Sequence, residues 1–333
     1  MELLTYISST TVLISIVTLA AMIVLCLGPF FLPILRRLKF GQSIREEGPK
    51  SHYAKSGTPT MGGIMILTSV TICTLFCNWY FFYWSSMELW MALFVTLGHG
   101  IIGFIDDFIK VVLKRNLGLK AKQKLLGQII MAAALAYIAE NYMGRGTDLW
   151  IPFLNQEIHL GALYYILIFL VLVGTTNAVN LTDGLDGLAA GTATIAASAY
   201  ALVCIYFEQE ALAVFCSAVA GASLGFLKFN IHPAKVFMGD TGSLALGGAL
   251  AAVAVMTKTE ILLILIGGVF VLEALSVIIQ VTSFKTRGKR VFLMSPIHHH
   301  FELSGWSEVK VVSVFWFVGL LFSILAILLL IQG

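Results

Sequence analysis

Aspartates in this sequence gather in three short motifs that interrupt long apolar runs. Asp106 and Asp107 are adjacent, Asp183 and Asp186 lie in segment 177–187, and Asp240 lies in segment 237–243. Adjacent carboxylates repel each other unless a cation joins them. Carboxylate oxygens combined with substrate phosphates are typical ligands of Mg²⁺. The three motifs therefore predict a metal-assisted site that acts on a phosphate.

Each motif also has a plain structural interpretation. Asn, Asp and Gly are turn residues, so segment 177–187 could be a polar turn between two membrane helices. The pair at 106–107 could be a solvated helix end balanced by nearby lysines, and Asp240 could simply cap a helix. The surrounding apolar sequence favours function, because carboxylates are costly at membrane depth and usually mark a site there.

Three consecutive histidines, His298, His299 and His300, follow a basic run at residues 285–290. Zinc ligands are usually spaced along the chain, and adjacent side chains rarely converge on one ion. Contact with a phosphate or pyrophosphate is the favoured interpretation, although part of the basic run would meet anionic lipid head groups. All five cysteines lie in apolar runs and are interpreted as packing residues.

The elements that carry these residues are predicted to be membrane helices. The 333 residues are 59% hydrophobic and only 12% charged, whereas a soluble protein carries roughly 25% charged residues. A spanning helix needs about 20 apolar residues. We predict an all-α integral membrane protein, a single polytopic domain over residues 1–333, whose first helix is retained and not cleaved as a signal. The ten predicted transmembrane helices are 11–35, 61–83, 88–106, 125–143, 161–179, 188–207, 211–228, 242–257, 261–282 and 311–331.

Charge distribution predicts the orientation of these helices. Nineteen of the 21 Lys and Arg residues fall in alternate connections, at 36–60, 107–124, 228–241 and 283–310. Positive residues stay cytoplasmic, so both termini are expected outside and the active site on the cytoplasmic face, where five of the six aspartates lie. A short hairpin is expected at 144–160 on the other face. A secondary transporter is disfavoured, because the acids cluster at one face and the two halves show no repeat.

Five segments, taken together, resemble one enzyme family. Segments 57–63, 106–107, 177–187, 236–240 and 296–300 are similar, in order, to motifs of the bacterial phospho-N-acetylmuramoyl-pentapeptide transferases, and the resemblance runs from about residue 36 to 310. The wider superfamily of polyprenyl-phosphate N-acetylhexosamine-1-phosphate transferases shares the aspartate motifs. A sister transferase that uses UDP-GlcNAc and polyprenyl phosphate is therefore the alternative.

The resemblance implies a multi-pass enzyme of the bacterial inner membrane that acts in peptidoglycan synthesis. It would transfer phospho-MurNAc-pentapeptide from UDP-MurNAc-pentapeptide to undecaprenyl phosphate, giving lipid I and UMP, and would require Mg²⁺. Direct attack and a covalent aspartyl intermediate both fit the family. The resemblance further implies a homodimer embedded in membrane lipid, inhibition by uridine-containing nucleosides, and no nucleic-acid partner.

The same resemblance assigns roles to individual residues. Asp240 and Asp107 would hold Mg²⁺, Asp106 would act as a base toward the lipid phosphate, and His299 would complete the catalytic set. Phe237 would stack on the uracil, and Lys124 is a rival of Lys122 at the diphosphate. The expected substrate-binding residues are Lys55, Lys122, Asn180, Asp183, Asp186, Asn230, Phe237, Gln280, His298 and His300.

Overall fold

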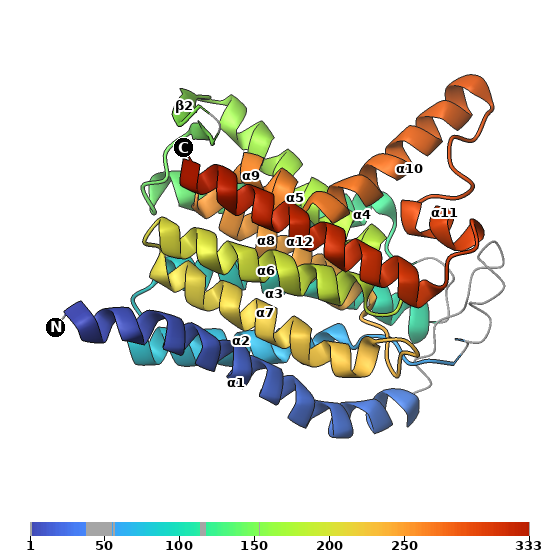
Figure 1. Cartoon of the computed structure of the whole chain (residues 1–333), viewed down its shortest axis with the longest axis horizontal. Coiled ribbons are helices and arrows are strands. Elements are labelled where there is room, and N and C mark those ends of the chain that lie inside the picture. Colours follow the sequence, from blue (N-terminus) through green and yellow to red (C-terminus); the bar gives the residue numbers. More distant parts are fainter. Residues whose placement is uncertain (1, 38–54, 56, 114–117, 153, 333) are drawn as a thin grey trace.

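A computed structural model describes residues 2–37, 55, 57–113, 118–152 and 154–332 as a helical bundle with one small hairpin (Figure 1). The basic residues Lys39, Arg45, Lys50, Lys114 and Arg115, which entered the orientation argument, lie outside the described residues. The elements are α1 (Glu2–Arg37), α2 (Gly63–Phe82), α3 (Met87–Val111), α4 (Ala121–Asn141), β1 (Asp148–Ile151), β2 (Gln156–His159), α5 (Leu163–Thr182), α6 (Leu188–Tyr206), α7 (Glu210–Asn230), α8 (Gly239–Met256), α9 (Glu260–Ile266), α10 (Gly268–Arg287), α11 (Ile297–Leu303) and α12 (Glu308–Gln332).

The helices confirm the predicted all-α membrane protein. Within the described part of the chain, nine helices are long and apolar enough to cross a membrane. The predicted span at 125–143 is also helical, as α4, but polar residues make it less apolar than the nine. They include Lys122 and Lys124 near its start and Glu140 near its end.

One helix that was predicted to be continuous is interrupted in the structure. The span at 261–282 is two helices, α9 and α10, which are separated at Gly267. A Cβ at the next residue, Gly268, would lie 2.5 Å from the ring of Phe322 on α12, so only glycine allows this close contact. Glycine also weakens a helix at this point. Beyond the break, α10 extends away from the bundle (Figure 1).

The centre of the bundle is α8, whose residues from Thr241 to Met256 are all buried. Glycine and alanine dominate this helix, and small residues let membrane helices approach closely. A Cβ at Gly247 would lie 2.6 Å from the Cα of Thr176 on α5, which shows how close the two backbones are. Helices α2, α3, α5 and α6 pack against α8, and α1 packs on the outer side of α7.

The two ends of the bundle differ in content (Figure 1). Both termini and the β1–β2 hairpin lie at one end, and α11 and the loop before α8 lie at the other. The hairpin confirms the one predicted at 144–160, with Asp148 opposite His159 and Ile151 opposite Gln156. A buried ion pair between Arg145 and Glu260 anchors it to α9.

Candidate functional site

Two glycines bring the predicted aspartates together. A Cβ at Gly103 on α3 would lie 2.1 Å from the backbone oxygen of Asp240, and a Cβ at Gly63 on α2 would lie 2.2 Å from the backbone nitrogen of Gly242. The start of α8 is therefore pressed against both helices. As a result, one carboxylate oxygen from each of Asp106, Asp107 and Asp240 lies within 4.8 Å of the others.

Asp107 accepts hydrogen bonds from the start of α8. One of its oxygens accepts from the Asp240 backbone N–H at 3.1 Å, and the other accepts from the Thr241 backbone N–H and hydroxyl at 2.9 and 2.6 Å. The first N–H groups of a helix lack internal partners, and a carboxylate there is favoured by the helix dipole. Asp107 therefore fixes the position of Asp240 in addition to offering its own lone pairs.

Lysines neutralise the cluster of three aspartates. Lys110 lies 2.5 Å from one oxygen of Asp106 and 3.3 Å from Asp240. Lys124 lies 3.1 Å from the same oxygen of Asp240. The other oxygen of Asp240 accepts a hydrogen bond from the Asn180 amide at 2.9 Å. Asp240 thus receives two ammonium groups and one amide at a partly buried position.

The donor set of the cluster suits a hard divalent cation. All three side chains offer carboxylate oxygens, which Mg²⁺ prefers, and Asp240 remains partly exposed. The ammonium groups of Lys110 and Lys124 lie against Asp240 and neutralise part of the negative charge of the cluster. The three aspartates could therefore hold a metal ion.

Asp183 ends α5 and lies next to this cluster. Burial raises the pKa of its carboxyl from 3.8 to about 8, and the negative charges of Asp240 and Asp107 add to the effect. A hydrogen bond from the Gly239 backbone opposes the shift. The raised pKa favours the protonated form of Asp183 in the metal-free protein.

We expect the raised pKa of Asp183 to make stability depend on pH. The folded protein holds this proton between pH 3.8 and about 8, whereas the unfolded chain has lost it. The free energy of unfolding should then fall as pH rises through this window. Thermal unfolding of detergent-purified, metal-free protein at pH 6 and pH 8 should show the loss. Asp183→Asn should reduce the dependence, and an equal slope in this variant would contradict the assignment.

A second group of charges forms around Asp186, in the turn between α5 and α6. Lys55 donates to one oxygen of Asp186 at 2.7 Å, and the Ala234 backbone donates to the other at 3.0 Å. Asn230 lies beside this turn, where it accepts from the Gly187 N–H and donates to the Val236 carbonyl. Asp186, Lys55 and Asn230 are thus brought together, which is the grouping that the family resemblance implies.

Phe237 is placed beside the aspartate cluster by its backbone. Its N–H donates to the Pro59 carbonyl at 2.8 Å, and its carbonyl accepts from the Gly62 N–H at 2.9 Å. These bonds join segment 57–63 to the residues just before α8. Phe237 itself is half-buried.

The three histidines lie on the short helix α11 and point to different partners. His298 is buried, with its Nδ1 3.1 Å from Glu273 on α10 and its ring against Gly184. His299 pairs with Glu302 at 2.8 Å, and His300 accepts from the Leu293 N–H at 3.2 Å. The rings of His298 and His299 lie with their centroids 4.1 Å apart, whereas His300 faces Phe292 and Leu293.

Two predicted residues lie apart from the aspartate cluster. Lys122 is exposed, and the lysine that contacts Asp240 is its rival, Lys124. Gln280 accepts from the Val291 and Phe292 N–H groups and donates to the Phe292 carbonyl, so its amide fastens this segment to α10.

Sequence reasoning missed the roles of three residues near the aspartates. Lys110 was considered only as a balancing charge, yet it bridges Asp106 and Asp240. His232 and Glu308 both contact Asp186. A lone histidine in a loop and a glutamate at a helix start carry no distinctive pattern, so neither offered a signal.

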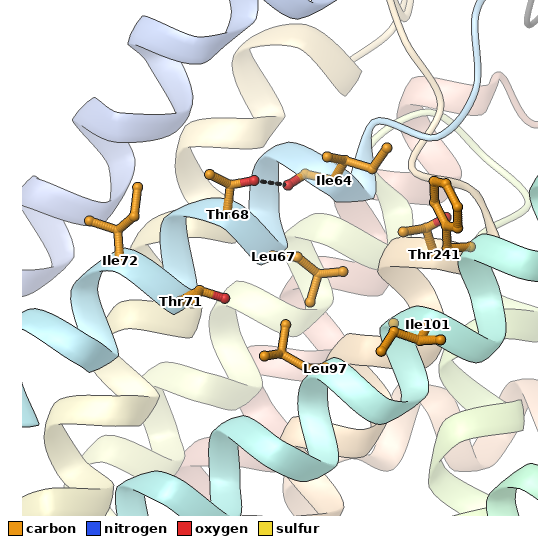
Figure 2. Close-up of a pocket in the computed structure, with 10 residues that line it drawn as sticks. Ile64, Leu67, Thr68, Thr71, Ile72, Leu97, Ile101 and Thr241 are labelled. Carbon is orange, nitrogen blue, oxygen red and sulfur yellow. Dashed lines mark hydrogen bonds between the residues drawn. The ribbon is translucent and has the colours of Figure 1, made fainter.

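Two apolar cavities lie between the helices. One, of about 400 Å³, lies between α2 and α3; Leu67 and Leu97 approach each other there, and Thr68 donates to the Ile64 carbonyl (Figure 2). Thr241 lies at one end of it. The other cavity, of about 330 Å³, lies between α5 and α9–α10. No aspartate lines either of these two cavities.

Comparisons with known proteins agree with the motifs. Residues 89–258 match the profile described as glycosyl transferase family 4, and residues 55–67 match phospho-N-acetylmuramoyl-pentapeptide-transferase signature 1. Proteins named phospho-N-acetylmuramoyl-pentapeptide-transferase are similar over nearly the full length. The one from Halalkalibacterium halodurans is 61% identical over 318 residues, covering 96% of this chain and 97% of its own. The one from Bacillus subtilis is 58% identical over 316 residues, covering 95% and 97%.

Proposed function

The chain belongs to the phospho-N-acetylmuramoyl-pentapeptide-transferase family, and we propose that its three clustered aspartates carry out Mg²⁺-assisted phosphoryl transfer. The chain is a multi-pass protein of the bacterial inner membrane that transfers phospho-MurNAc-pentapeptide in peptidoglycan synthesis. UDP-MurNAc-pentapeptide is the donor and undecaprenyl phosphate the acceptor, and lipid I and UMP are the products. The signature match at residues 55–67 favours this reaction over the UDP-GlcNAc alternative.

The observation that carries the proposal is the convergence of Asp106, Asp107 and Asp240 within 4.8 Å. Asp240 and Asp107 would hold Mg²⁺, which when bound would neutralise charge on the diphosphate. Phosphoryl transfer depends mostly on positioning and electrostatic stabilisation. Asn180 orients the Asp240 carboxylate, and Asp107 fixes the backbone beneath it.

The remaining groups of the cluster suit the acceptor and the diphosphate. Asp106 is the candidate base: its Oδ2 would take the proton of the lipid phosphate, and its Oδ1 is held by the Leu119 N–H at 2.8 Å. Lys110 and Lys124 would contact phosphate oxygens. His299 and His300 are our candidates for the sugar side, and the buried His298 would support them from beneath.

The nucleotide would lie against the wall formed by Lys55, Asp186, Asn230 and Phe237. The ring of the half-buried Phe237 would stack on uracil. The ion pair of Lys55 and Asp186 would contact the polar edge of the uracil. This placement supports inhibition by uridine-containing nucleosides. We also propose that the enzyme is a homodimer, as the family resemblance implies.

The isoprenoid tail needs an apolar entry from the bilayer. The cavity between α5 and α9–α10 would supply it, since its lining is almost wholly apolar and its exposed members, such as Leu170 and Ile264, face outward. The break at Gly267 turns α10 away from the bundle beside this cavity.

The test of the proposed function is UMP release in proteoliposomes. Purified protein should release UMP from UDP-MurNAc-pentapeptide only when undecaprenyl phosphate and Mg²⁺ are both present, and chelation should stop it. UDP-GlcNAc offered in its place should give no turnover. UMP release in the absence of undecaprenyl phosphate, or in the absence of Mg²⁺, would contradict the proposal.

Phe237→Ala should weaken the binding of a uridine-containing nucleoside by on the order of 1–3 kcal/mol, because base stacking on an aromatic ring is worth about that much. Calorimetric titration of the detergent-purified variant would measure the loss. Phe237→Tyr keeps the ring and is the matched control, with affinity close to that of the unmodified protein. Unchanged affinity in the alanine variant would remove Phe237 from the pocket.

A further inference from the structure

We infer that Glu308 is a positioning residue for the nucleotide, because it holds Lys55 and the turn that carries Asp186. This inference rests on the proposed function, which places uridine against Lys55 and Asp186. Glu308 is the first residue of α12 and lies 253 positions after Lys55 in the sequence. Neither the family match at 89–258 nor the signature at 55–67 includes it.

One oxygen of Glu308 serves both parts of the nucleotide wall. It accepts from the Lys55 ammonium at 2.5 Å and from the backbone N–H of Asp186 at 2.7 Å. The Lys55 ammonium also lies 2.7 Å from the Asp186 carboxylate. Glu308 therefore ties the lysine to the aspartate through the backbone as well as through charge.

The other oxygen of Glu308 reaches His232. The His232 Nδ1 lies 3.2 Å from Glu308 and 3.1 Å from Asp186, so one imidazole spans the two carboxylates. The side chains of Asp186 and Glu308 are only 2% and 10% exposed. Buried charges need partners, and removal of one partner leaves the others uncompensated.

These contacts let the group act as a clamp without a metal ion. Asp186, His232 and Glu308 offer ligand atoms within 4.8 Å, which by itself would fit a metal ion. The ammonium of Lys55, however, lies between the two carboxylates and already supplies the positive charge. The cation of this group is therefore a side chain of the protein.

A second contact from α12 supports the same turn. The indole N–H of Trp316 donates to the Gly187 carbonyl at 3.2 Å. A Cβ at Gly191 would lie 2.1 Å from the same indole, so the ring packs directly on the start of α6. Helix α12 thus holds residues 186–187 at two points, and Glu308 is the one that also reaches Lys55.

Glu308→Gln tests this role through binding without turnover. UMP titrated calorimetrically into the purified variant should bind about tenfold more weakly, since loss of a charge-assisted contact is worth roughly that factor. The KM for UDP-MurNAc-pentapeptide should rise by a similar factor, with kcat changed by less than about threefold. Glu308→Asp keeps the carboxylate and should recover part of the affinity.

Two further measurements separate positioning from general stability. Glu260→Gln removes a buried acid that pairs with Arg145 at the opposite end of the bundle, and it should leave UMP affinity unchanged. Glu308→Gln and Lys55→Met should be non-additive in a double-mutant cycle if Glu308 acts through Lys55. Unchanged UMP affinity in folded Glu308→Gln, or full additivity, would overturn the inference. Failure of the unmodified protein to bind UMP would instead refute the proposed nucleotide wall itself.

Discussion

Asp240→Asn should lower turnover by on the order of 100- to 1,000-fold, the usual cost of removing one preorganised electrostatic group from a transition state. The variant keeps the size of the side chain and its contact with Asn180, but it loses the charge that attracts Lys110, Lys124 and a metal ion. UMP release in proteoliposomes, with size-exclusion chromatography to verify folding, measures the effect. Near-normal turnover in this variant would contradict the assignment of Asp240 as a ligand of Mg²⁺.

Among the variants of the three clustered aspartates, Asp240→Asn gives the result that is easiest to interpret. Asp106→Asn and Asp107→Asn should also nearly abolish turnover. Asp107, however, caps the start of α8, so its replacement mixes catalytic and structural loss. The matched control is Asp148→Asn at the opposite end of the bundle, where the carboxylate meets His159 and Lys258. That variant should turn over like the unmodified protein.

Lys124→Met should lower turnover by about tenfold to a hundredfold, the value of a charge-assisted contact, because its ammonium lies 3.1 Å from Asp240. Lys122→Met is the control two residues away, and it should change turnover by less than about twofold, since Lys122 is exposed. Steady-state assays of the two purified variants side by side decide between the lysines. A larger loss in the Lys122 variant would reverse the assignment.

The Lys124 variant also tests what the lysine does. Its ammonium and a metal ion compete for the same carboxylate, so removing the ammonium should not raise the Mg²⁺ concentration needed for half-maximal turnover. A higher Mg²⁺ requirement would instead mean that Lys124 helps to build the metal site. Reduced kcat at an equal or lower Mg²⁺ requirement fits a lysine that contacts the diphosphate.

The sequence predicted the helices and the gathering of aspartates for a physical reason. The length of an apolar run can be read from composition. Charged residues are costly inside a bilayer, so their placement also forms a visible pattern. The break at Gly267 left no such pattern, because glycine occurs in many continuous membrane helices. It becomes understandable only through the Phe322 ring that presses on Gly268.

The site was predicted less completely, because its contacts depend on packing. Lys122 and Lys124 point roughly 200° apart around one helix, so only one of them can face the aspartates, and the rotation of α4 decides which. Spacing alone cannot fix that rotation. Glu308 meets the Asp186 backbone across 122 positions of sequence, and an acid in the first turn of a helix is ordinary. Nothing local distinguishes it.

The contact of Gly103 with the Asp240 backbone limits how this enzyme could escape a drug. Any larger residue at 103 would strike that backbone, and a side chain at Gly63 would strike α8 from the other side. We therefore expect few substitutions at positions 63 and 103 to leave the aspartates in place. A compound that binds the three carboxylates would therefore face a backbone arrangement that accepts no larger residue at 63 or 103.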